Sequence, residues 1–422
     1  MRTPQRAASA RRLVRTHRRA ARRPLLAVPA GRYREGMAAT QLPVTRSLRQ
    51  ARLAVSAAFL ANGLGFANWA ARIPAVKDDV GLSTGALGVA LLGIALGAVV
   101  AMPLAGALLV RFGSRTLTRL TLALFCVALP LPALAGSLPA LMGALALLGV
   151  ASGSLDVSMN AQGVLIERRY GRPLLAGLHG LWSLGSLGGA LIGGAAAGAG
   201  ISPRAHLLVV AAVLLVAGML ATRRLLPGGA DRDQATPRFV RPTRTLALLG
   251  AIAFCALLSE GAAYDWSAVY LRDSLGSSEG LAVSAYAAFT LTMTVGRLVG
   301  DRLRARFGSR ALLCSAALIA AAGLGGGLAL RHTVAAVLGF AVLGAGLSCV
   351  VPIVFGAAGS ASGLPSGPAI AVVSTVGYLG FIVGPPIIGG LGEITSLPAA
   401  LTLVVALTAL VGVTARRLPP LD

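Results

Sequence analysis

Twelve apolar runs divide the chain, and each is long enough to cross a lipid bilayer as a helix. A helix of about 20 residues spans the roughly 30 Å hydrocarbon core of a membrane. Lipid offers the backbone no hydrogen-bond partner, so such runs satisfy their own N–H and C=O groups as helices. We therefore predict an all-α membrane protein with twelve transmembrane helices. The predicted spans are residues 52–71, 84–110, 117–136, 139–166, 174–198, 204–222, 245–271, 279–300, 309–330, 333–356, 368–391 and 397–415.

The composition argues against a soluble protein, because 56% of the 422 residues are hydrophobic and only 12% are charged. The net charge of +24 would suit nucleic acid, but the arginines gather in the N-terminal segment and at span ends, so no nucleic-acid partner is expected. The four cysteines lie inside apolar spans without a CxxC pair. No phosphate loop or nucleophile–base pair is in view. We predict no enzyme activity, metal or cofactor.

The distribution of positive charge predicts the orientation. An even number of spans places both termini on one side of the membrane. Of the 38 Lys and Arg residues, 33 lie on the side of the termini. The others are Arg72, Lys77, Arg204, Arg272 and Arg331. Because cytoplasmic loops are enriched in Lys and Arg, both termini are predicted to be cytoplasmic, in a multi-pass protein of the cytoplasmic membrane.

The first 50 residues differ from the rest of the chain. They carry many arginines and too few apolar residues to bury a core, so residues 1–50 are expected to be a disordered basic tail. Two explanations stay open for this tail. It is either a solvated cytoplasmic segment or the product of a start assigned too early, with Met37 as the true initiator.

An internal repeat indicates two related halves. The sequence RFGSR at residues 111–115 recurs at 306–310, an offset of 195 residues. Repeats of this length are typical of transporters built from two similar bundles. We predict a six-helix half at 51–222, a cytoplasmic linker at 223–244 and a second six-helix half at 245–422.

Two acids lie deep within predicted spans. Asp156 is ten residues before the end of the span 139–166, about 15 Å from that end, and shares a helical face with Asn160. Glu260 lies about 22 Å from the start of its own span, with Tyr264 one turn further on. No Lys or Arg is expected near the middle of any span, so neither acid has an expected counter-ion.

These acids have two interpretations. A neutral acid can simply be hydrogen-bonded inside a helix bundle. Alternatively, an acid at this depth belongs to a transport path and takes up and releases a proton. We favour the second interpretation and predict Asp156 and Glu260 as proton-coupling residues. The polar residues Asn62, Asn160 and Tyr264 are predicted to face the substrate cavity.

The loops after the second and eighth spans resemble the G-x-x-x-D-R-x-G-R signature of the major facilitator superfamily. The first copy ends in RFGSR and has Val110 where the family has an acid; the second, from Gly296 to Arg310, retains Asp301. The resemblance covers the chain from about residue 50 onward. In that family these turns latch the cytoplasmic side, and Arg297 and Asp301 are spaced for an ion pair. The latch residues that the resemblance implies are Arg111, Arg115, Arg297, Asp301, Arg302, Arg306 and Arg310.

Within this superfamily, the helix-4 sequence around Asp156 and the helix-7 sequence around Glu260 resemble the fucose-permease-like branch, and most of all its YbjJ-type inner-membrane proteins. Fucose permease uses an acid in helix 4 for proton-coupled sugar symport, which the resemblance carries over to Asp156. Fucose permease also has an acid in helix 1. This chain lacks that acid, since the central polar residue of its first span is Asn62.

The expected function is secondary active transport of a small polar, sugar-like solute by alternating access, coupled to protons. The partners expected are this solute, the proton and the lipid bilayer, and the chain is expected to act as a monomer. Two alternatives stay open. The chain could be a proton-driven exporter of amphipathic compounds, or a membrane sensor or scaffold that binds without transporting.

Overall fold

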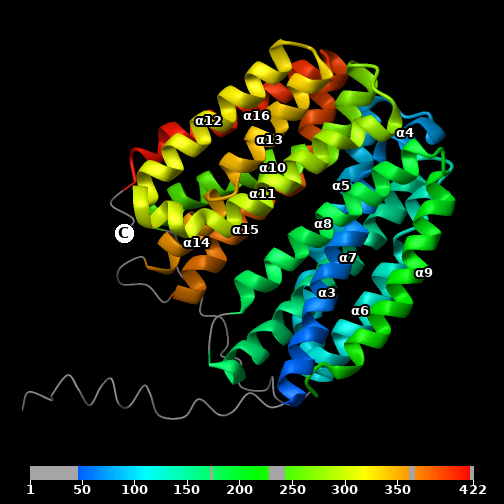
Figure 1. The fold of residues 1–422 in the computed structure, drawn as a ribbon, viewed down its shortest axis with the longest axis vertical. Helices are drawn as coiled ribbons and strands as arrows, with labels where there is room; N and C mark the ends of the chain where they lie inside the picture. Colours follow the sequence, from blue (N-terminus) through cyan, green and yellow to red (C-terminus); the bar gives the residue numbers. More distant parts are fainter. Residues whose placement is uncertain (1–45, 172–173, 228–242, 361–365, 419–422) are drawn as a thin grey trace, which may run out of the picture. The chain divides into compact units, whose positions relative to one another are not determined.

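The computed structural model describes residues 46–171, 174–227, 243–360 and 366–418. The chain from Arg46 onward is one compact unit, drawn as a ribbon in Figure 1. The predictions for Met37, for most of the basic tail and for most of the linker concern residues outside these ranges. The last five residues of the predicted tail, 46–50, are already helical.

Twelve helices in the described residues are long and apolar enough to cross a membrane, which confirms the predicted fold class. A short helix, α4 (Ile73–Val80), follows the first of them. The first six spans are formed by α3 (Arg46–Ala70), α5 (Thr84–Phe112), α6 (Ser114–Ala128), α7 (Leu138–Tyr170), α8 (Leu175–Gly198) and α9 (Pro203–Ala221). The last six are formed by α10 (Arg244–Val269), α11 (Glu279–Phe307), α12 (Ser309–Ala329), α13 (Thr333–Leu347) with α14 (Val350–Gly359), α15 (Ser366–Ile394) and α16 (Leu397–Ala415).

Hydroxyl side chains fix where several of these helices begin. Ser83, Ser137, Ser202 and Ser396 each accept a hydrogen bond from the backbone N–H three residues further on. Such a cap satisfies one of the free N–H groups of the first turn and contributes about 1 kcal/mol. The capped helices therefore start close to the residues at which their apolar runs begin.

Two predicted spans are interrupted. In the third, α6 ends at Ala128 and a 3₁₀ turn covers Leu131–Leu134, because Pro130 and Pro132 cannot donate the hydrogen bonds of a continuous helix. In the tenth, residues 348 and 349 form a turn between α13 and α14. Apolar composition continues through both breaks, so hydropathy alone does not reveal them.

The two RFGSR turns have the same local structure. Gly113 separates α5 from α6 with φ 76° and ψ 156°, and Gly308 separates α11 from α12 with φ 77° and ψ 152°. An L-residue with a side chain rarely adopts a positive φ. The shared conformation explains why both copies place glycine at this position.

Helices from the first and last six spans pack directly on each other, α8 against α11 and α5 against α15. Glycines allow these backbones to meet. A Cβ atom added to Gly389 of α15 would lie 2.8 Å from the Cα of Gly88 in α5. One added to Gly280 of α11 would lie 3.0 Å from the Cα of Gly198 in α8. No side chain separates the helices at these crossings, as is common where helices pack closely in membranes.

Candidate functional site

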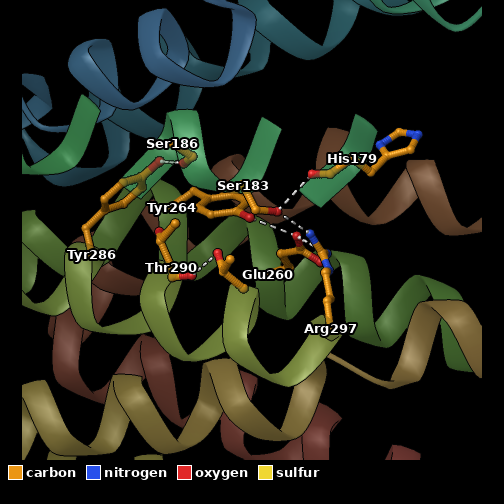
Figure 2. Close-up of polar contacts among 9 residues, drawn as sticks. His179, Ser183, Ser186, Glu260, Tyr264, Tyr286, Thr290 and Arg297 are labelled. Carbon is orange, nitrogen blue, oxygen red and sulfur yellow. Dashed lines mark hydrogen bonds and ion pairs between the residues drawn. The ribbon is translucent and has the colours of Figure 1, made fainter. Parts of the chain in front are cut away.

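Glu260 of α10 forms an ion pair with Arg297 of α11 (Figure 2). The Arg297 Nη2 lies 3.1 Å from the Glu260 Oε1, and 7% and 26% of the glutamate and arginine side chains are exposed. Glu260 lies 16 residues from the start of α10, about 24 Å along the helix. The expectation that Glu260 has no counter-ion is therefore wrong, and so is the expected pair between Arg297 and Asp301, because Arg297 points to Glu260 instead.

Tyr264 lies one turn after Glu260 and donates its hydroxyl hydrogen to the same Oε1 atom, at 2.9 Å. Its ring packs against the rings of Tyr286 and Phe289, with centroid distances of 5.6 and 5.4 Å. The aromatic contacts and the hydrogen bond hold Tyr264 in place as a partner of the carboxylate. The i, i+4 spacing predicted that the two residues share a face, but not that they bond.

The site reaches across to the first six spans through α8. Arg297 Nη1 donates to the Ser183 Oγ at 3.3 Å, and the Ser186 Oγ lies 3.0 Å from the Tyr286 hydroxyl. Figure 2 shows these side chains meeting between α8 and the α10–α11 pair. Ser183, Ser186 and Tyr286 were not predicted. The serines lie in a glycine-rich helix, where small residues are ordinarily assigned to packing.

Asp156 is half-buried on α7 and accepts a hydrogen bond of 3.0 Å from Asn160 Nδ2. The same Nδ2 donates to the Asp156 carbonyl at 2.9 Å. Within the described part of the chain, no Lys, Arg or His forms an ion pair with Asp156.

Asn62 joins α3 to α8. Its Oδ1 accepts a hydrogen bond of 2.7 Å from the Trp182 indole nitrogen, and Gly63, the next residue, abuts the Trp182 carbonyl. Asn62 itself is buried, and its Nδ2 has no partner among the described residues. An unpaired buried donor is costly, and the Asn62 side chain serves mainly to join α3 to α8 through Trp182.

The predicted latch residues other than Arg297 lie around the RFGSR turns. Arg111 lies over the Phe112 ring at 5.2 Å, and Arg306 over the Phe307 ring at 5.4 Å. Arg115 Nη2 donates to the Arg223 carbonyl at 2.8 Å. Apart from Arg297, no predicted latch residue forms an ion pair with another described residue, and Asp301, Arg302 and Arg310 are exposed.

No group of three or more His, Cys, Asp or Glu side chains in the described ranges could hold a metal ion. The chemistry available at the site is that of a carboxylate–guanidinium pair, a separate carboxyl–amide pair and several hydroxyl groups. These groups can exchange protons and form hydrogen bonds with a polar solute.

Comparisons with known proteins agree with this architecture. The family model of the Major Facilitator Superfamily matches residues 55–366 and 252–422. An uncharacterised MFS-type transporter of Yersinia pestis is 36% identical over 361 residues, covering 85% of this chain and 93% of its own. The membrane protein MosC of Rhizobium meliloti is 34% identical over 362 residues, covering 85% of this chain and 88% of its own.

The fold is also similar to a solved structure. The crystal structure of the nucleoside transporter NupG aligns with a TM-score of 0.69 over 89% of this chain and 99% of its own, at 13% sequence identity. At this identity the likeness concerns the fold alone. The fold, the family match and the relatives together identify the chain as a multi-pass membrane transporter that belongs to the major facilitator superfamily.

Proposed function

We propose that the protein is a proton-coupled secondary transporter of a small polar, sugar-like solute in the cytoplasmic membrane. In this proposal the halves 51–222 and 245–422, joined by the linker 223–244, alternate access to a central site as a monomer with cytoplasmic termini. The observation that carries the proposal is the pair of acids deep inside spanning helices, one from each half: among the described residues Asp156 is bonded only to the amide of Asn160, and Glu260 is bonded to Arg297 and Tyr264.

Asp156 is the better candidate for the coupling proton. An ionised carboxylate inside the membrane costs several kcal/mol unless a cation or a proton neutralises it. Asn160 supplies only a hydrogen bond, and no cation is paired with Asp156 within the described residues. Proton uptake removes the charge without breaking an ion pair, so Asp156 can gain and lose a proton while its surroundings stay intact.

Glu260 has a different role in this proposal. As a pair, Glu260 and Arg297 carry no net charge, and protonation of Glu260 would leave the guanidinium without a counter-ion. Arg297 also bonds Ser183 in the other half, so a change at Glu260 alters a contact between the halves. In this proposal the Glu260–Arg297 pair couples the protonation of Glu260 to the relative position of the two halves.

Hydrogen-bonding groups around these acids suit a solute rich in hydroxyl groups. Asn160 is half-buried beside Asp156, and Tyr264 carries its hydroxyl group beside Glu260. Amides and hydroxyl groups both donate and accept hydrogen bonds, as sugar hydroxyls require.

The test uses purified protein in proteoliposomes, with a sugar identified by uptake profiling of a deletion strain. Under an imposed pH gradient, Asp156→Asn should abolish accumulation while exchange of labelled for unlabelled sugar continues, because an amide resembles the protonated acid. Full pH-driven accumulation by both Asp156→Asn and Glu260→Gln would refute proton coupling through these residues.

A further inference from the structure

Charged side chains join the two sets of spans at the end of the molecule that is predicted to be external. Lys77 of α4 bonds Asp273, which follows α10, with an Nζ–Oδ2 distance of 2.7 Å. Next to it, Arg272 bonds Asp78 with an Nη2–Oδ2 distance of 3.0 Å. Each pair connects α4, which follows the first span, to the helical turn Tyr270–Ser274 at the end of the seventh span.

The two pairs are reciprocal. Lys77-Asp78 and Arg272-Asp273 are both a basic residue followed by aspartate, and they are 195 residues apart, the same offset as the RFGSR repeat. The base of each dipeptide bonds the acid of the other. Corresponding surfaces of two repeats therefore contact each other in the way that a two-fold symmetric dimer interface does.

Further contacts close the same end. Glu279 accepts from Arg272 Nη1 at 3.0 Å, and its other carboxylate oxygen lies 3.8 Å from the fully buried Arg72. Arg72 also donates to the Ile201 carbonyl. A further contact joins α5 to α15, where the Gly85 N–H donates to Glu393 Oε2 at 2.8 Å. The close glycine crossings of α5 with α15 and of α8 with α11 lie just inside these contacts.

We infer that the two basic–Asp dipeptides form a reciprocal latch that holds the external end of the transporter closed. Both pairs lie between the same two segments, so the same separation of the halves breaks both. The side chains of the latch are between 13% and 45% exposed, so water screens the pairs and each contributes only modestly. A latch of this strength can open in every transport cycle. The inference uses the predicted orientation and does not depend on proton coupling.

The experiment measures access to a buried position beneath the latch. Val283 of α11 is 2% exposed, and its Cβ lies 3.5 Å from the position of a Cβ added to Gly194 in α8. A Val283→Cys side chain becomes reachable from outside when α8 and α11 separate. The reporter is placed in a full-length chain whose native cysteines are changed to alanine, and a membrane-impermeant maleimide is added to intact cells. The cysteines to be changed are Cys126, Cys255, Cys314 and Cys349.

Neutralising both acids, with Asp78→Asn and Asp273→Asn, should raise the labelling rate from outside roughly three- to tenfold, as expected for the loss of two partly exposed ion pairs. The matched control is Asp79→Asn, because Asp79 is the neighbouring acid and forms no ion pair with any described residue. The control should leave the rate nearly unchanged. The inference would be overturned if the doubly neutralised variant and Asp79→Asn were labelled at equal rates. It would also be overturned if labelling became faster only from the cytoplasmic face.

Exchanging the charges gives an independent test. Lys77→Asp alone places like charges opposite each other and should raise labelling above that of the parent. Adding Asp273→Lys restores an opposite-charge pair and should return the rate toward that of the parent. A double variant that labels as fast as Lys77→Asp would show that the pair does not hold this end closed. If each variant reaches the cell surface in an amount comparable to the parent protein and elutes as a single peak in size-exclusion chromatography, misfolding is excluded as the cause of faster labelling.

Discussion

Asp156 and Glu260 are both acids deep inside a spanning helix, yet their surroundings differ. Glu260 shares one oxygen between Arg297 and Tyr264, whereas Asp156 has the amide of Asn160 one turn away. Removing the charge of Glu260 would leave a cation behind, whereas removing that of Asp156 would not. Two acids at similar depth in the membrane can therefore differ in what their neutralisation leaves behind. The difference comes from the partners of each acid.

The largest effect should come from Glu260→Gln. Breaking a buried ion pair from one side typically costs about 3–5 kcal/mol, and the partial exposure of Arg297 reduces this to about 2–3 kcal/mol. We expect a clear fall in the midpoint of thermal unfolding in detergent, followed by intrinsic fluorescence. Adding Arg297→Gln should recover part of the loss, because no uncompensated charge then remains. If Glu260→Gln unfolds at the parent temperature, the pair does not stabilise the fold.

Tyr264→Phe should have the next largest effect. The variant keeps the ring contacts with Tyr286 and Phe289 but removes one hydrogen bond to a charged group, which is worth about 1.5–3 kcal/mol. The same unfolding measurement applies. Tyr286→Phe is the matched control, because its hydroxyl bonds a neutral serine and should contribute about 1 kcal/mol. Equal losses in the two variants would contradict the special role of the Glu260 carboxylate.

Ser183→Ala should have a smaller effect on stability, about 0.5–1 kcal/mol, since it removes two long hydrogen bonds, one from Arg297 and one to the His179 carbonyl. Its effect should appear in the coupling between halves. In a double-mutant cycle with Glu260→Gln, the loss from Ser183→Ala should shrink when Glu260 is already neutral. Strict additivity would mean that Arg297 does not link Ser183 to Glu260.

Asp156→Asn should have the smallest effect, within about 0.5 kcal/mol of the parent, because an amide is cheaper to bury than an unpaired carboxylate and keeps a similar shape. Asn160→Asp, which would place two acids side by side at i, i+4, is the contrasting variant and should destabilise through like-charge repulsion. An Asp156→Asn variant as unstable as Glu260→Gln would reveal a cation partner for Asp156 and remove the contrast between the two acids.

Much of the fold could be predicted from the sequence, because the length of an apolar run is enough to predict a membrane helix. The same-face pairs Asp156–Asn160 and Glu260–Tyr264 followed from helical spacing. The partner of Arg297 was predicted wrongly for a definable reason. The predicted span ended at residue 300, which put Arg297 near a helix end, but α11 continues to Phe307. Arg297 therefore lies about 15 Å inside the helix, and its long side chain reaches Glu260.

The contacts between helices distant in sequence were not predictable in the same way. Ser183 meets Arg297, and Trp182 meets Asn62, through the packing of α8 on α11 and on α3. Spacing along one helix gives the direction of a side chain but not which other helix lies opposite it. The reciprocal dipeptides are an intermediate case, since the repeat offset was visible in the sequence but the contact between the copies was not.

The crossings of Gly88 with Gly389 and of Gly198 with Gly280 bear on how fast the transporter can turn over. Where side chains interdigitate, a change in crossing angle requires several rotamers to change together, which raises the activation barrier. At these crossings backbone meets backbone, so the helices can change their angle without repacking. A bulkier residue at Gly88 or Gly389 would clash with the facing backbone. We therefore expect it to disfavour the state in which α5 and α15 touch and to lower the rate of solute uptake.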